Sequence, residues 1–324
     1  MKPKSKHLCL IDGSGFLFRA FHALPPMTRK DGTPVNAVFG FTKMVMKLIE
    51  DTNSTHMAVI FDRARKTFRS EIYANYKSNR PPPPDELIPQ FQLVREATEA
   101  MNLPAIDMDG FEADDLIATY ARQASEDGAD VTIISSDKDL MQLVTGRVKM
   151  LDAMKSRLIG PEQVREKFGV GPEHVVDVQA LAGDSVDNVP GVEGIGVKTA
   201  AQLINQYGDL DSLLDRAAEI KQPKRRERLI EQADMARLSR ELVRLHDKVP
   251  VEHGWTSFEA KNFDPYTLLP FLEQQNFQSL LSTMASRLGL KGHGARSTVD
   301  DHNSAKAKAY ALIQTEKALK SWIK

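Results

Sequence analysis

The chain has 324 residues, 43 Lys and Arg against 44 Asp and Glu, a formal net charge of −1, and 41% hydrophobic residues. It therefore has ample apolar material for a core, but no apolar run approaches the ~20 residues of a membrane helix. The apolar run 7–11, after the basic start, is too short for a secretory signal, so we expect a cytoplasmic protein. The single cysteine, Cys9, cannot form an internal disulfide, and the histidines are too scattered for a zinc site.

The first half of the chain alternates strand-like and helical patterns. Strand-like runs occur at 7–11, 57–61 and 131–136, and helical patterns at 38–50, 86–101 and 115–126. Such alternation is typical of an α/β fold with a mainly parallel central sheet covered by helices. The prolines within 80–86 predict a stiff, extended entry to the helix that follows.

The second half of the chain is mostly helical. Helical patterns occur at 161–168, 172–183, 198–208 and 224–245. Beyond residue 290 the sequence becomes polar and poor in large apolar residues, which indicates a linker. The residues after that linker read as one strand and the start of a helix, which is too little for a domain.

Acidic residues gather where a ligand would lie in a parallel sheet. Three strand-like runs each end on an aspartate, and two further clusters follow. The full set is Asp12, Asp62, Glu112, Asp114, Asp115, Asp137, Asp139, Asp184 and Asp187. The carboxyl ends of parallel strands meet at one edge, so we expect these acids to converge there.

Any one of these acids could simply begin a turn or cap a helix. These roles do not explain the whole cluster, because two carboxylates ~5 Å apart repel by roughly 3 kcal/mol at an effective dielectric of ~20. Hard oxygen ligands without His or Cys suit Mg²⁺ or Mn²⁺. Two such ions ~3.5–4 Å apart would support hydrolysis of a phosphodiester.

Two segments have features of nucleic-acid binding. Residues 63–80 contain six Lys or Arg and one Glu, interleaved with aromatic residues that could stack on unpaired bases. A solvated amphipathic helix is the alternative. Residues 190–204 carry three glycines ahead of Lys198, a pattern that lets backbone N–H groups approach phosphate, although a plain glycine-rich connector has the same composition. The basic run 221–228 reads equally well as a solvated helix face.

Five motifs, in order over residues 7–290, resemble the 5′ nuclease (flap endonuclease) superfamily, most closely the N-terminal 5′→3′ exonuclease domains of bacterial DNA polymerases I. They are IDGSGFLFRAFHAL, VIFDRARKTFRSEIYANYKSNR, GFEADDLIATYA, ISSDKDLMQLV and ALAGDSVDNVPGVEGIGVKTA. The resemblance implies a PIN-like 5′ nuclease fold with a helical helix-hairpin-helix (H3TH-type) subdomain.

The resemblance also implies roles for individual residues. The first metal group is Asp12, Asp62, Glu112 and Asp114, with Asp115 beside it. The second metal group is Asp137, Asp139 and Asp187, with Asp184 in support. The catalytic residues are Lys77, Arg80, Asp12, Asp62, Asp114 and Asp137. The DNA-binding residues are Arg69, Tyr73, Tyr76, Lys77, Arg80, Gly191, Gly194, Gly196 and Lys198.

These implications give a complete hypothesis. Residues 1–175 form the catalytic region, with a helical arch at about 63–101, and residues 176–290 form a helical DNA-binding region. A linker at 291–307 leads to the truncated start, 308–324, of a 3′-5′ exonuclease-like domain. The expected activity is 5′→3′ exonuclease and 5′-flap endonuclease action on DNA and RNA-DNA hybrid primers in Okazaki-fragment processing and excision repair. The expected cofactors are two or more Mg²⁺ or Mn²⁺ ions, with K⁺ at the hairpin, in a nucleoid-associated monomer. A non-catalytic nucleic-acid clamp and a PIN-like ribonuclease are the alternatives.

Overall fold

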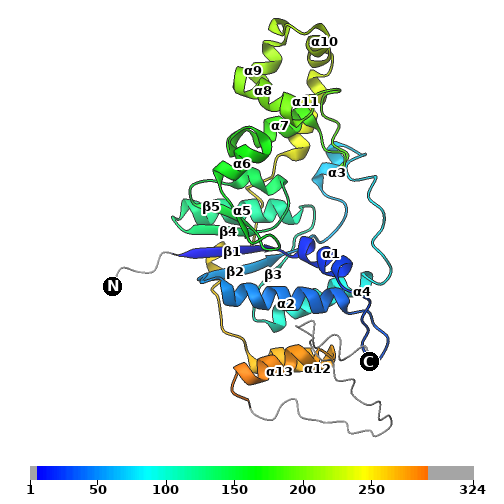
Figure 1. Cartoon of the computed structure of the whole chain (residues 1–324), viewed down its shortest axis with the longest axis vertical. Coiled ribbons are helices and arrows are strands. Elements are labelled where there is room, and N and C mark those ends of the chain that lie inside the picture. Colours follow the sequence, from blue (N-terminus) through cyan, green and yellow to red (C-terminus); the bar gives the residue numbers. More distant parts are fainter. Residues whose placement is uncertain (1–5, 291–324) are drawn as a thin grey trace, which may run out of the picture.

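A six-stranded sheet forms the centre of the molecule, and its strands run in the order β3-β2-β1-β4-β5-β6 (Figure 1). The computed structural model describes residues 6–290, so the linker and the truncated domain expected beyond them lie outside the described residues. The strands are β1 (His7–Asp12), β2 (His56–Ile60), β3 (Ala105–Ile106), β4 (Asp130–Ile134), β5 (Val148–Asp152) and β6 (Arg157–Ile159). Pairing is parallel from β3 to β5, and only the edge strand β6 is antiparallel.

Both faces of the sheet are buried, which is why its central strands read as continuous apolar runs. Side chains alternate along β1: Leu8 and Leu10 enter one core, and Cys9 and Ile11 enter the other. The first core is shared with helices α5 (Ala113–Glu126) and α6 (Pro161–Phe168). The second core is shared with α1 (Gly13–Ala23), α2 (Asn36–Asp51) and α4 (Ile88–Ala100). The predicted α/β sheet covered by helices is therefore confirmed.

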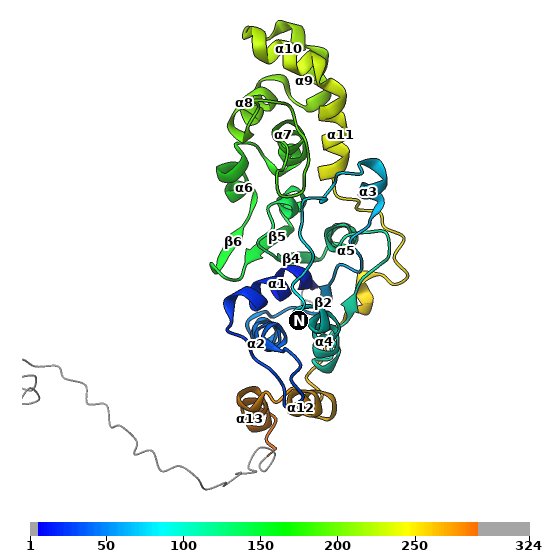
Figure 2. The same ribbon diagram turned by 90° about the vertical axis from the view of Figure 1, so that its right-hand side faces the viewer.

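A helical unit lies beyond one end of the sheet (Figures 1 and 2). Its helices are α7 (Val175–Ala182), α8 (Val197–Tyr207), α9 (Leu210–Asp215), α10 (Pro223–Glu231) and α11 (Ala233–Val243). The single helical pattern expected at 224–245 is broken at Gln232, whose φ of −108° and ψ of 21° are not helical. The Gln232 side chain accepts a hydrogen bond from Glu193 N in the glycine-rich hairpin, which holds the junction in place.

The chain then returns to the sheet, which corrects the expectation that all of 176–290 is one helical DNA-binding region. Phe258 O accepts a hydrogen bond from Met57 N on β2. Helices α12 (Pro265–Gln274) and α13 (Gln278–Arg287) then pack into the core below α2 and α4, far from α7–α11 (Figure 1). Their apolar stripe predicts burial, but it does not reveal against which surface.

The arch expected at about 63–101 is also shorter than predicted. Between residue 63 and α4, only α3 (Phe68–Ile72) is helical, and the prolines 81–84 lie in neither a helix nor a strand. Helix α4 belongs to the layer that covers the sheet, because its buried Gln90 accepts hydrogen bonds from Ala37 N and Val38 N at the start of α2. The segment free to form an arch therefore ends before Ile88. None of the helices in the described range is long and apolar enough to cross a bilayer.

Packing of α12–α13 on the sheet makes a measurable prediction. Phe277 is 2% exposed and meets Phe39 edge to face with ring centroids 5.2 Å apart. We expect Phe277→Ala to lower the free energy of unfolding by about 3–5 kcal/mol in urea titrations because it leaves a cavity. Tyr266→Ala, at a side chain that is 88% exposed on the same pair of helices, should change it by less than ~0.5 kcal/mol. Equal effects of the two substitutions would contradict this packing.

Candidate active site

Carboxylates from three adjacent strands meet at the carboxyl edge of the sheet. Asp12 is the last residue of β1, Asp62 follows β2, and Asp137 follows β4, with β1 lying between the other two. The N-terminus of α5 faces this edge, because Asp62 Oδ1 accepts a hydrogen bond from Ala113 N at 2.9 Å. Glu112 and Asp114 are carried to the same place by that helix end. The predicted convergence of strand-end acids is therefore present.

Asp12 is held by the backbone and by a neighbouring strand. Its Oδ1 accepts from Gly15 N at 2.8 Å and so caps α1, while its Oδ2 accepts from Ser135 Oγ at 2.8 Å. A Cβ added at Gly15 would lie 2.5 Å from Asp12 Oδ2, and one added at Gly13 would lie 2.5 Å from the Phe61 ring. The glycines of the IDGSG motif are thus needed to bring α1 close to the carboxylate.

The metal-free acids repel one another. Burial, and then the charges of Asp62 and Asp137, raises the pKa of Asp12 to about 6. Burial and the same neighbours, together with Asp12, raise the pKa of Asp114 well above its ordinary value. These four carboxylates therefore share one electrostatic environment, which a bound cation would relieve.

A second acidic group comes from the segment after β4 and the loop after α7. Burial, followed by the charge of Asp137, raises the pKa of Asp139 to about 7, although Gln179 Nε2 donates to its Oδ1 at 2.5 Å. Burial would also raise the pKa of Asp184, but hydrogen bonds from Lys138 and from Val186 N hold it below its ordinary value. One cavity is lined by acids of both groups: Glu112, Asp114, Asp139, Asp184 and Asp187.

Basic side chains of the 63–80 segment lie directly on these acids. Lys77 Nζ is 2.8 Å from Glu112 Oε1 and 3.6 Å from Asp187 Oδ2, and Arg80 forms an ion pair with Asp187. Burial would lower the pKa of Lys77, but the charges of Glu112 and Asp187 raise it instead. The backbone is docked too, since Lys77 N donates to Asp187 O at 2.9 Å. Lys77 and Arg80 therefore lie against the acids, and their expected contact with a scissile phosphate stays a prediction.

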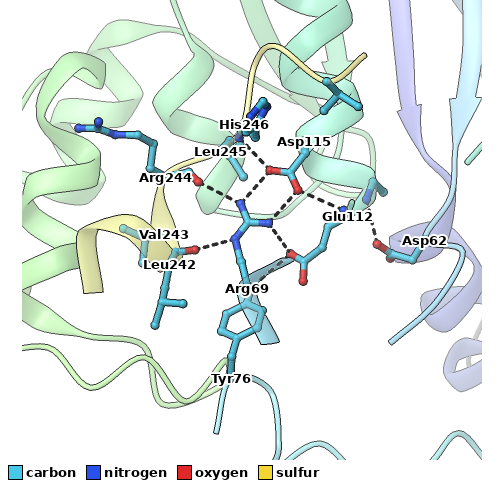
Figure 3. Close-up of polar contacts among 12 residues, drawn as sticks. Asp62, Arg69, Tyr76, Glu112, Asp115, Leu242, Val243, Arg244, Leu245 and His246 are labelled. Carbon is cyan, nitrogen blue, oxygen red and sulfur yellow. Dashed lines mark hydrogen bonds and ion pairs between the residues drawn. The ribbon is translucent and has the colours of Figure 1, made fainter. Parts of the chain in front are cut away.

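Two predicted site residues have a different role in the structure. Asp115 is fully buried and binds the guanidinium of Arg69 through both oxygens, at 2.7 and 2.8 Å (Figure 3). Asp115 is therefore not free to ligate a metal as predicted. Arg69 is 1% exposed and cannot reach a DNA phosphate, so its assignment to DNA binding is wrong.

Three other residues predicted to bind DNA, two tyrosines and one glycine, have structural contacts instead. Tyr76 is buried and donates its hydroxyl to Glu112 Oε2 at 3.2 Å, so it does not offer a face for base stacking, while Tyr73 is partly buried against a small core that includes Leu242. Gly191 has a φ of 66°, and a Cβ there would lie 2.4 Å from Gly183 N, which makes it a structural glycine.

The rest of the hairpin is more open. A Cβ at Gly194, whose φ is 75°, would meet the tip of the flexible Arg228 side chain at 2.2 Å, and one at Gly196 would meet nothing within 4 Å. Gly196 precedes α8, which places it and Lys198 at an accessible helix N-terminus.

The acids fit a hard divalent cation in chemistry, although they are not arranged around one. Among residues 6–290, no three His, Cys, Asp or Glu side chains are grouped so that they could hold a metal ion as they stand. Several carboxylates are instead paired with Lys77, Arg80 and Lys138. Carboxylate oxygens are nevertheless the ligands that Mg²⁺ and Mn²⁺ prefer. At Glu112, Asp184 and Asp187, these basic side chains therefore occupy carboxylate oxygens that an ion would use.

Several residues that shape the site were not found from the sequence. Ser14 Oγ accepts from Asp62 N at 2.9 Å, Ser135 links Asp12 to Asp137 N, and Gln179 binds Asp139. Serine and glutamine side chains carry no charge signal, so only their proximity to the acid motifs could have drawn attention to them. Ser14 and Ser135 lie within two residues of predicted site acids, whereas Gln179 lies forty residues from Asp139.

The raised pKa values predict how pH affects the metal-free protein. Below pH ~4 both folded and unfolded chains hold these protons, and between pH ~4 and ~7 the unfolded chain releases them first, which favours unfolding. We therefore expect Asp139→Asn to gain stability relative to the unsubstituted chain as the pH rises through this range in EDTA. Mg²⁺ should stabilise the unsubstituted chain more at pH 7.5 than at pH 5. Thermal unfolding measures both effects, and a pH-independent difference would exclude repulsion at Asp139.

Comparisons with known proteins agree with this geometry. At 58% identity over 290 residues, DNA polymerase I of Rhizobium leguminosarum matches 87% of this chain and 28% of its own length. The 5′-3′ exonuclease of Aquifex aeolicus is 37% identical, over 85% of this chain and 94% of its own. The chain thus spans about a third of the DNA polymerase I relatives that it matches but nearly all of the Aquifex protein.

Solved structures share the fold. A T5 5′-exonuclease with bound zinc aligns with a TM-score of 0.64 and 22% identity, covering 87% of this chain and 98% of that one. The catalytic core of Rad2 in complex with DNA substrate aligns with a TM-score of 0.58 and 15% identity, covering 84% and 88%. Family models match residues 7–169 (5′-3′ exonuclease, N-terminal resolvase-like domain) and 170–266 (5′-3′ exonuclease, C-terminal SAM fold). With a strand-edge acid cluster beneath a basic segment and with these matches, the chain belongs to the 5′-3′ exonuclease family.

Proposed function

We propose that this chain is a structure-specific 5′→3′ exonuclease and 5′-flap endonuclease that hydrolyses phosphodiesters of DNA and of RNA primers with two or more Mg²⁺ or Mn²⁺ ions. The observation that carries the proposal is the direct contact between the acid cluster and a basic side chain of the arch segment. Acids from β1, β2, β4 and α5 meet at one sheet edge, and Lys77 of the arch segment lies against Glu112 among them. The groups proposed to hold cations and those proposed to hold a polyanion are thus in direct contact, and Glu112 and Asp187, which pair with Lys77 and Arg80, line one cavity.

The proposed ligands fall into two groups after Asp115 is removed. The first group is Asp12, Asp62, Glu112 and Asp114. The second group is Asp137, Asp139 and Asp187, with Asp184 in support through Lys138. Ions bound there supply charge that activates water and stabilises the leaving oxygen in phosphodiester hydrolysis.

Lys77 and Arg80 have two sets of partners in this proposal. Without substrate they neutralise Glu112 and Asp187. A scissile phosphate and divalent ions would exchange these pairs, since the ions take the carboxylates and the phosphate takes the ammonium and guanidinium groups. Lys77 would then orient the phosphate beside the acids that hold the ions.

Duplex binding is assigned to the hairpin before α8. Gly194, Gly196 and Lys198 lie at the helix N-terminus, where free N–H groups and the helix dipole favour a phosphate. Carbonyl oxygens of the same hairpin are candidates for a K⁺ ion. The contact would be independent of base sequence, which suits an enzyme that recognises a junction.

The biological setting rests on the relatives. Because several of them are named DNA polymerase I and are about three times as long, we place this chain in Okazaki-fragment processing and excision repair. We further propose that it acts in the cytoplasm, at the nucleoid, as a monomer.

Two other functions make different predictions. A non-catalytic clamp would bind flaps without cutting them when Mg²⁺ is supplied. A PIN-like ribonuclease would cut single-stranded RNA without preference for a junction. A labelled 5′ flap and a matched single-stranded RNA, each tested with Mg²⁺ and with chelator, separate the three functions.

Replacing one acid from each group tests catalysis. We expect Asp114→Ala and Asp137→Ala each to reduce flap cleavage in Mg²⁺ by at least ~10³-fold, because these acids are proposed to bind the ions. Flap affinity in the presence of chelator should stay within a few-fold of the parent value, because the acids are not proposed to bind DNA. Lys149→Ala, at an exposed position on β5, is the control and should cut normally. Full activity in either acid variant would refute the assignment.

Two glycines of the hairpin separate a structural role from a phosphate-binding role. Gly196→Ala meets no atom within 4 Å and should leave the melting temperature unchanged, yet weaken duplex binding by about tenfold because the methyl group occupies the approach of a phosphate. Gly191→Ala should instead destabilise the fold, since its Cβ meets the Gly183 backbone. Anisotropy with duplex DNA and thermal unfolding measure the two effects. Unchanged DNA affinity in Gly196→Ala would move the binding surface away from the hairpin.

A further inference from the structure

Arg69 is a buried arginine with a partner for its whole guanidinium group. Its Nη1 and Nη2 bind the two oxygens of Asp115, and its Nε and Nη2 donate to Leu242 O at 2.8 Å and Arg244 O at 2.9 Å (Figure 3). Those carbonyls lie at the end of α11, where a helix leaves its last C=O groups without partners. Arg69 itself is on α3, at the base of the arch segment. One side chain thus joins the arch to the helical unit.

Asp115 extends the connection to the metal-binding end of α5. Its Oδ1 also accepts from His246 N at 2.8 Å, and its Oδ2 accepts from Glu112 N at 3.1 Å. Four donors therefore converge on a carboxylate that is 0% exposed. A fully paired buried ion of this kind holds its partners in one geometry, because loss of any partner leaves a charge unsatisfied.

Glu112 is the residue through which this network reaches the site. Its backbone N–H binds Asp115, its Oε2 lies 3.5 Å from Arg69 Nη1, and the same oxygen accepts from the Tyr76 hydroxyl (Figure 3). Its other oxygen faces Lys77. Both the main chain and the carboxylate of a proposed metal ligand are therefore oriented by the Arg69–Asp115 pair.

We propose that the Arg69–Asp115 pair is a positioning element: it fixes Glu112 and the start of α5 against the end of α11, so that metal affinity depends on how the arch base and the helical unit are held. The proposal rests on the proposed function only in taking Glu112 as a metal ligand. It assigns no contact with metal or DNA to either member of the pair. Outer partners that orient a ligand typically contribute 10–100-fold to metal affinity or activity.

The test variant is Arg69→Met/Asp115→Leu, which replaces the pair with apolar side chains and leaves no unpaired buried charge. Calorimetric titration with Mn²⁺, without DNA, measures metal affinity, and anisotropy of a labelled 5′ flap in chelator measures DNA affinity. We expect Mn²⁺ affinity to fall about 10–100-fold and flap affinity to stay within about twofold. Arg69→Lys keeps the charge but loses the bidentate contact with Asp115, so its Mn²⁺ affinity should lie between those of the parent and of the double variant.

Arg122→Met is the matched control. Arg122 lies two turns further along α5 and also donates to the segment after α11, through Nε to Asp247 O at 2.9 Å, with Glu126 as its acidic partner. The Arg122→Met substitution removes a similar hydrogen bond near the other end of α5 and should leave Mn²⁺ affinity unchanged.

Other results would overturn the proposal. Mn²⁺ affinity within twofold of the parent in the folded double variant would make the pair purely structural. A loss with Asp115→Asn but not with Arg69→Met would make Asp115 a ligand, and a loss of flap affinity alone would make Arg69 a DNA contact. If the double variant does not fold, Arg69→Lys and Asp115→Asn decide between the same outcomes. A parent protein that binds Mn²⁺ normally but cuts no flap would refute the proposed function and leave this proposal standing.

Discussion

Repulsion among carboxylates gathered at one edge of the sheet is the constraint around which the site is organised. Strand ends bring Asp12, Asp62 and Asp137 together, and a helix end adds Asp114 to the same environment. Hydrophobic packing of the sheet fixes the backbone positions of these acids, which limits how far the carboxylates can move apart. The protein instead supplies positive charge in several forms. Backbone N–H groups bind Asp12 and Asp62, and lysine or arginine side chains pair with Glu112, Asp184 and Asp187.

These compensating charges differ in how easily they can be exchanged. The hydrogen bonds from Gly15 N and Ala113 N belong to helix N-termini and stay in place as long as the fold does. Lys77 and Arg80 are carried by a short segment outside the sheet layers and are 21% and 47% exposed. The exchangeable cations are therefore on the part of the chain that substrate would contact. In the proposed function, the arrival of a phosphate would therefore be coupled to the release of carboxylates for metal binding.

Much of this site could be predicted from the sequence because its residues are charged and because they follow strand-like runs. Aspartates that follow strand-like runs, such as Asp12 and Asp137, need only the rule that parallel strands end at one edge. The sequence could not separate Asp114 from Asp115, since adjacent acids point in different directions from a helix and only tertiary packing decides which one meets Arg69. Arg69 was misassigned for the same reason: a basic residue in a basic segment gives no sign that its partner is buried. The destination of α12 and α13 was equally hidden, because an apolar stripe does not identify the surface that it covers.

The return of the chain along β2 before α12 changes the mechanical character of the helical unit. Two crossings, one after α6 and one after α11, connect the unit to the sheet, and the second continues into helices anchored beneath it (Figures 1 and 2). A domain on a single tether can swivel freely, whereas one inserted between two anchored strands of chain resists torsion and transmits it. A displacement of α7–α11 would accordingly be transmitted to the sheet, with which these helices also share one continuous hydrophobic core.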